Sequence, residues 1–119
     1  MGIDIASDDL RLLEEMFGPG VRAHREGELP LVVLPVVHLA EGCAPASAMA
    51  IFVATAYLGY DSRLYFEAPI RLASGTVPAT TSAILLGRTM FAASIQGVPA
   101  TLPPHQAILA HLRRYRLSA

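Results

Sequence analysis

The sequence lacks lysine, tryptophan and asparagine altogether, and it has a single cysteine, Cys43. Without lysine, neither a Schiff base nor a phosphate-binding P-loop can form. One cysteine excludes an intramolecular disulfide and a multi-cysteine zinc site, and it fits a reducing, cytoplasmic setting. Nucleophile-elbow and dinucleotide-binding glycine motifs are also missing from the sequence. We therefore expect no cofactor.

Charge is also scarce. Charged residues make up 16% of the 119 residues, hydrophobic residues make up 53%, and the formal net charge is -1. This composition excludes intrinsic disorder and gives no general attraction to nucleic acid or to an anionic membrane. The acidic N-terminus does not resemble a signal peptide, and the longest apolar stretch is shorter than the roughly 18 residues that span a bilayer. The length predicts a single domain over residues 1–119.

So high an apolar content in so short a chain has a consequence for association. A domain of this size cannot bury all of its apolar side chains in one core. An exposed apolar patch is typical of a surface that meets another protein. We therefore predict that the working protein is a hetero- or homo-oligomer.

The spacing of apolar residues predicts a helix at each end of the chain and strands between them. The helices are expected over 8–17, with Ser7 as the N-cap, and over 103–117, opened by two prolines. Strands are expected over 21–26, 29–39, 48–57 and 63–67, whereas 80–87 and 88–95 are ambiguous between strand and loop. This order predicts an α+β fold, an antiparallel meander sheet with the N-terminal and C-terminal helices packed on one face. The expected core residues are Leu13, Phe17, Phe52, Leu64, Phe66, Ile108 and Leu112.

Cys43 is the one thiol nucleophile in the sequence. It lies in a loop rich in glycine, alanine and proline, which favours exposure, but the nearest charged residue in sequence is Glu41, which disfavours the reactive thiolate. A structural role for Cys43 and a catalytic one both stay open. The four histidines show no metal-binding spacing, so no metal site is expected.

The most distinctive segment, residues 59–70, is rich in aromatic residues and follows directly on Tyr57 and Leu58. Tyr57, Tyr60 and Tyr65 lie close in sequence to Arg63, and tyrosine and arginine are the residue types most often found at binding hot spots. One interpretation is an exposed recognition surface, with Arg63 held by a neighbouring carboxylate. The other is a tight turn whose aromatic rings close the core.

The order of elements resembles the fold of ubiquitin-conjugating enzymes and of the related RWD domains. The resemblance rests on Tyr57, Tyr60 and Pro69 in the turn after the third strand, and on the proline-opened C-terminal helix. Small bacterial members of that superfamily accompany ubiquitin-like proteins and their activating enzymes. The resemblance therefore implies a bacterial conjugation or antiviral defence system, with a ubiquitin-like protein or an activating enzyme as the partner.

Two departures from the family pattern bear on activity. The catalytic cysteine of the family would fall within residues 80–96, where this chain has none, and the family's His-Pro-Asn tripeptide is missing. The resemblance thus implies a non-catalytic adaptor that binds its partner through the tyrosine-rich turn. Two alternatives stay open: a thioester-carrying enzyme that uses Cys43, and a small-molecule-binding or oligomer-forming domain unrelated to ubiquitin.

Overall fold

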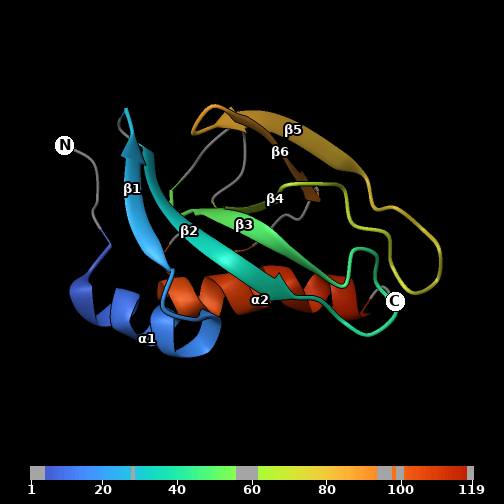
Figure 1. Ribbon diagram of the computed structural model, residues 1–119, viewed down its shortest axis with the longest axis horizontal. Coiled ribbons are helices and arrows are strands. Elements are labelled where there is room, and N and C mark those ends of the chain that lie inside the picture. Colours follow the sequence, from blue (N-terminus) through green and yellow to red (C-terminus); the bar gives the residue numbers. More distant parts are fainter. Residues whose placement is uncertain (1–4, 28, 56–61, 94–97, 99–100, 118–119) are drawn as a thin grey trace.

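Two helices and one antiparallel sheet form the part of the chain that the structure describes. The structure is a computed structural model, and it describes residues 5–27, 29–55, 62–93, 98 and 101–117 (Figure 1). The elements are α1 (Ser7–Phe17), β1 (Arg22–Glu26), β2 (Leu29–His38), β3 (Ser47–Val53), β4 (Arg63–Phe66), β5 (Thr80–Leu85), β6 (Arg88–Ala93) and α2 (Pro104–Leu117). The sheet has six strands in the order β1-β2-β3-β4-β6-β5.

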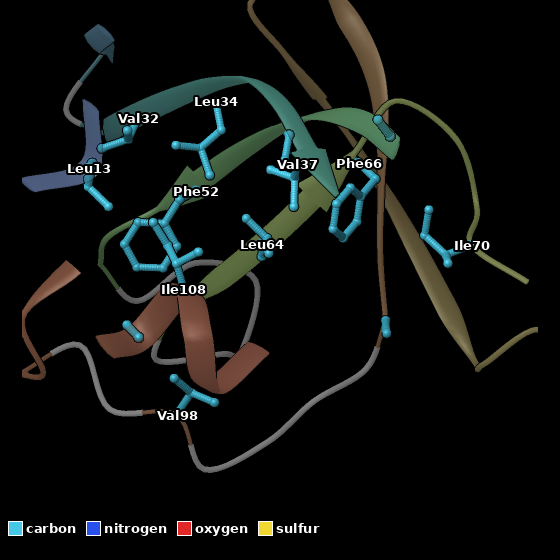
Figure 2. Packing of buried hydrophobic residues seen from close by; sticks show 14 of the residues in the cluster. Leu13, Val32, Leu34, Val37, Phe52, Leu64, Phe66, Ile70, Val98 and Ile108 are labelled. Atoms are coloured by element: carbon cyan, nitrogen blue, oxygen red, sulfur yellow. The ribbon is translucent and has the colours of Figure 1, made fainter. Parts of the chain in front are cut away.

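Both helices lie on the same face of this sheet (Figure 1). Leu13 of α1 and Ile108 of α2 join one buried cluster with Phe52 of β3 and with Leu64 and Phe66 of β4 (Figure 2). Side chains alternate between the two faces of a strand, so these even-numbered residues of β3 and β4 all point toward the helices. The predicted α+β fold with both helices on one face is confirmed.

The opposite face of the sheet holds a second apolar cluster. Its buried residues are Leu31, Ile51, Val53, Tyr65, Leu85, Met90 and Ala92. The β5–β6 hairpin encloses this face, because its tip reaches back to the β1–β2 end, where Leu86 N donates a hydrogen bond of 2.8 Å to Glu26 Oε2. Strand β3 is therefore covered on both sides, as its apolar sequence predicts.

A two-residue turn, Leu86-Gly87, joins β5 to β6. Both residues have a positive φ, 51° and 76°, which is the geometry of a type I′ hairpin turn. Glycine adopts this geometry without strain, whereas leucine rarely does. The usual residues of a type I′ turn are Asn-Gly and Asp-Gly, and this turn has Leu-Gly in their place. For this reason the hairpin was ambiguous from the sequence.

The boundaries of two elements differ clearly from the prediction. Helix α1 begins at Ser7, with Ala6 as the N-cap and no side-chain capping hydrogen bond, so the prediction of a Ser7 cap is wrong. Strand β3 ends at Val53, before the predicted end at residue 57.

In the described part of the chain no helix has the length and the apolar character needed to cross a bilayer.

Candidate functional site

An apolar groove opens between the C-terminal end of α1, the end of β2 and the outer side of α2. Its volume is about 680 Å³. The described residues that line it are Met16, Phe17, Val36, His38, Leu39, Ala40, Leu109, Leu112 and Arg113. Several of these apolar side chains remain in solvent, including Leu109, whose exposed fraction is 46%. The groove is thus an apolar surface that the described residues leave partly exposed.

A β-bulge in β2 shapes one wall of the groove. Leu34 pairs with Ala50 but Val37 pairs with Ala48, so β2 carries an extra residue between them. A bulge re-aims the neighbouring side chains, and here Val36 is exposed and lines the groove.

The turn between α1 and β1 packs against the bulge of β2 through Gly20 and Pro35. A Cβ atom on Gly20 would lie 2.6 Å from Pro35 Cγ, so this close approach requires glycine. The contact holds the end of α1 against β2, and it thereby fixes the two walls of the groove relative to each other.

The groove has few charged side chains. Among the described residues that line it, Arg113 carries a positive charge and His38 is the other ionisable residue, and both are exposed. An apolar surface beside an arginine favours a ligand that is itself apolar and carries a carboxylate.

Two of the predicted binding residues are buried instead of exposed. Arg63 has an exposed fraction of 2%, and Tyr65 is fully buried in the cluster on the face away from the helices. Neither side chain presents a surface to a partner in this structure, so the expectation of an exposed hot spot at Arg63 is wrong. Tyr57 and Tyr60 lie outside the described residues.

The guanidinium of Arg63 links three strands. Its Nη1 donates to Thr81 Oγ1 of β5 at 2.6 Å, and its Nη2 donates to the carbonyl oxygens of Ala92 and Ala93 of β6, each at 3.0 Å. Its Cζ lies 5.1 Å from the centroid of the Tyr65 ring. Glu67, a carboxylate four positions after Arg63, accepts a hydrogen bond from Met49 N. Arg63 is therefore a structural residue that joins β4 to the β5–β6 hairpin.

A buried serine and histidine lie beside Arg63. Ser62 Oγ donates to the carbonyl oxygen of Val98 at 3.0 Å and lies 3.0 Å from His111 Nε2. A hydroxyl has one proton, so while Ser62 donates to Val98 its contact with His111 is one in which Nε2–H donates to Oγ. The pair thereby ties α2 to the residue that precedes β4.

The environment of His111 keeps its ring neutral. Burial and, as the smaller cause, the nearby positive charge of Arg63 together lower the pKa of His111 from 6.5 to about 4. The unfolded chain exposes this ring, so protons bind to the unfolded state first when the pH falls below 6.5. The contribution of His111 to stability is thus fully present above pH 6.5 and is lost as the pH falls toward 4.

We expect the free energy of unfolding to decrease between pH 6.5 and pH 4 by about 3 kcal/mol through His111 alone. His111→Gln keeps an N–H donor for Ser62 and does not titrate, so its stability should depend less on pH over this range. His24→Gln removes an exposed histidine of β1 and should keep the wild-type dependence. Urea titrations at several pH values measure all three. Equal pH slopes for His111→Gln and the wild type would contradict this assignment.

Cys43 lies in the interior, contrary to what its loop composition favours. Its exposed fraction is 6%, and it belongs to the cluster that faces the helices. Ala44 pairs with Arg71 in an isolated antiparallel bridge, which holds the loop against the rest of the domain. A thioester with a partner protein requires an accessible sulfur, and this structure does not offer one at Cys43.

The described residues contain no group of three or more histidine, cysteine, aspartate or glutamate side chains that could hold a metal ion. No protein family, curated protein or solved structure gives a match to this chain. The geometry of the groove and of the buried polar residues therefore carries the functional argument.

The sequence contained a partial signal for the groove. Leu10, Leu13, Met16 and Phe17 form the apolar stripe of α1, and such a stripe is typical of residues that pack in a core. In the structure Leu13 is buried, whereas Met16 and Phe17 reach the groove. A stripe that extends past the end of the helix, next to an exposed Val36, shows its second role only when β2 and α2 are in place.

Proposed function

We propose that this protein is a non-catalytic binding module that takes up an apolar, acidic segment of a partner protein in the groove between α1, β2 and α2. The observation that carries the proposal is the composition of the groove: half-exposed apolar side chains beside the exposed guanidinium of Arg113. A ubiquitin-like protein, or its activating enzyme, is the partner that the resemblance implies. The setting would then be a bacterial conjugation or defence system in the cytoplasm.

The openness of the groove favours a protein segment over a small molecule. Sites for small ligands enclose most of the surface of their ligand. Here Met16, Val36 and Leu109 stand well exposed along the groove, so a compact ligand would leave much of this apolar surface in water. An amphipathic segment laid along the groove would cover them, in the manner of helix-in-groove recognition.

The positive charge of Arg113 determines which of these segments bind well. Arg113 offers a planar donor for a carboxylate, and His38 adds a second polar contact on the opposite side of the lining. A basic apolar segment would meet like charge at Arg113 and lose affinity. The partner segment should therefore combine apolar residues with at least one aspartate, glutamate or C-terminal carboxylate.

Substitution of Leu109 by aspartate should weaken binding of the cognate ubiquitin-like protein by about 2 kcal/mol or more, roughly thirtyfold. Leu109 is half-exposed, so the change should leave the melting temperature close to that of the wild type. Isothermal titration calorimetry measures the affinity. Val77→Asp is the matched control, because Val77 is also an exposed apolar residue but lies outside the groove.

Gel electrophoresis with and without a reducing agent tests whether the protein forms a thioester. Incubation with the ubiquitin-like protein, its activating enzyme and ATP should give no adduct that a reducing agent removes. A reducible adduct that is lost in Cys43→Ala would contradict the adaptor function. Binding that survives Leu109→Asp unchanged would contradict the assignment of the groove.

A further inference from the structure

We propose that β5 is a pairing edge, through which two copies of this chain join their sheets antiparallel about a twofold axis. Strand β5 is the last strand of the sheet and has β6 as its sole neighbour in the described sheet. An edge strand leaves a row of backbone N–H and C=O groups without ladder partners.

The hairpin geometry determines which backbone groups point outward. Leu85 and Arg88 flank the two-residue turn, so they form a hydrogen-bonded pair of the β5–β6 ladder. Pairs alternate along an antiparallel ladder, so Ala83 and Thr81 also direct their N–H and C=O groups toward β6. The backbone groups of Thr80, Ser82 and Ile84 then point away from the sheet.

The two edges of the sheet differ in charge. Strand β1, at the other edge, has the sequence Arg-Ala-His-Arg-Glu and is mostly exposed. Charged side chains of this kind are what proteins use to prevent pairing at an edge. Strand β5 has the sequence Thr-Thr-Ser-Ala-Ile-Leu, with neither a charge nor a proline. Only β5, of the two described edges, is without such protection.

The side chains of β5 add an apolar contact on the outer side. Ile84 has an exposed fraction of 69%, and Val77 and Leu86 on either side of the strand are also exposed. In the isolated chain most of the Ile84 side chain stays in contact with water, so it contributes little apolar burial. It would be covered if a neighbouring strand lay alongside β5.

A second copy of β5 complements the first in one register. When Ser82 lies opposite Ser82 of the copy, Thr80 lies opposite Ile84, and every outward N–H meets an outward C=O. Residues directly opposite in an antiparallel pair share a face, so each Ile84 packs on a Thr80 methyl group. The strand is uncharged, so the two copies do not repel each other. This pairing has twofold symmetry and closes as a dimer.

Sedimentation velocity from micromolar to near-millimolar concentration tests this pairing. We expect the wild type to shift from monomer to dimer. Ile84→Lys places a charge at the edge and should lower the association constant by about tenfold or more. Ser82→Pro removes an outward N–H but no ladder bond to β6, so it should also weaken the dimer and leave the fold intact.

Thr89→Lys is the matched control. Thr89 pairs with Ile84 and is exposed on the same side of the hairpin, but it belongs to β6. The dimer should persist in Thr89→Lys, and amide hydrogen exchange should show protection of Ser82 and Ile84 that increases with concentration. A wild type that stays monomeric, a dimer that survives both β5 variants, or equal loss in Thr89→Lys would overturn the proposal. The groove variant Leu109→Asp should dimerise like the wild type, which separates this surface from the groove.

Discussion

Phe52→Ala is expected to lower the free energy of unfolding by about 3–5 kcal/mol. Phe52 is buried near the C-terminal end of β3 and lies in the cluster that joins the sheet to both helices (Figure 2). Its ring also meets the ring of His111 edge to face, with centroids 6.3 Å apart and an interplanar angle of 63°. Truncation removes this contact and leaves a cavity where β3 and α2 meet.

Chemical denaturation with urea measures this loss, with Val77→Ala as the control. Val77 is exposed, so its truncation should change the free energy of unfolding by less than about 0.5 kcal/mol. A loss below about 1 kcal/mol for Phe52→Ala would show that the helices do not pack on this residue.

Arg63→Ala is expected to cost about 3 kcal/mol, because it removes a buried donor from several acceptors at once. The carbonyl oxygens of Ala92 and Ala93 and the hydroxyl of Thr81 would each lose a hydrogen bond from the guanidinium. The ladder between β4 and β6 is short, with Phe66 and Phe91 as its paired residues, so the side chain of Arg63 is a main link between these strands.

This expectation differs from that of an exposed arginine, whose truncation would leave stability nearly unchanged. Arg88→Ala provides that comparison, because Arg88 lies on β6 and is exposed. Thermal unfolding followed by circular dichroism should show a clear decrease in melting temperature for Arg63→Ala and almost none for Arg88→Ala. Equal melting temperatures for the two variants would contradict the structural role of Arg63.

The parts of the fold with a strong local pattern could be predicted from the sequence. The apolar spacing of α1 and the valine-rich and leucine-rich run of β2 gave both elements nearly at their observed bounds. The core residues Phe52 and Leu64 followed from the same patterns. The β5–β6 hairpin did not, because small residues and a Leu-Gly turn carry little local preference.

The burial of Arg63 and the composition of the groove could not be predicted from the sequence, because both depend on contacts between distant segments. The carbonyl oxygens that hold Arg63 lie about thirty positions later in the chain, so nothing near Arg63 marked it as buried. The groove combines residues from α1, β2 and α2, and its exposure results from the bulge beside Val36. The burial of Cys43 likewise depends on a distant contact, because the bridge from Ala44 to Arg71 holds its loop against the domain.

An NMR titration of the isotope-labelled protein with the cognate ubiquitin-like protein tests the central claim most directly. If the protein is a non-catalytic binding module, the perturbed amides should cluster at the end of α1, at the end of β2 and along α2 from Leu109 to Arg113. The perturbations should need neither ATP nor an activating enzyme. Absence of binding, or perturbations centred on the loop around Cys43 with the groove unaffected, would contradict the account.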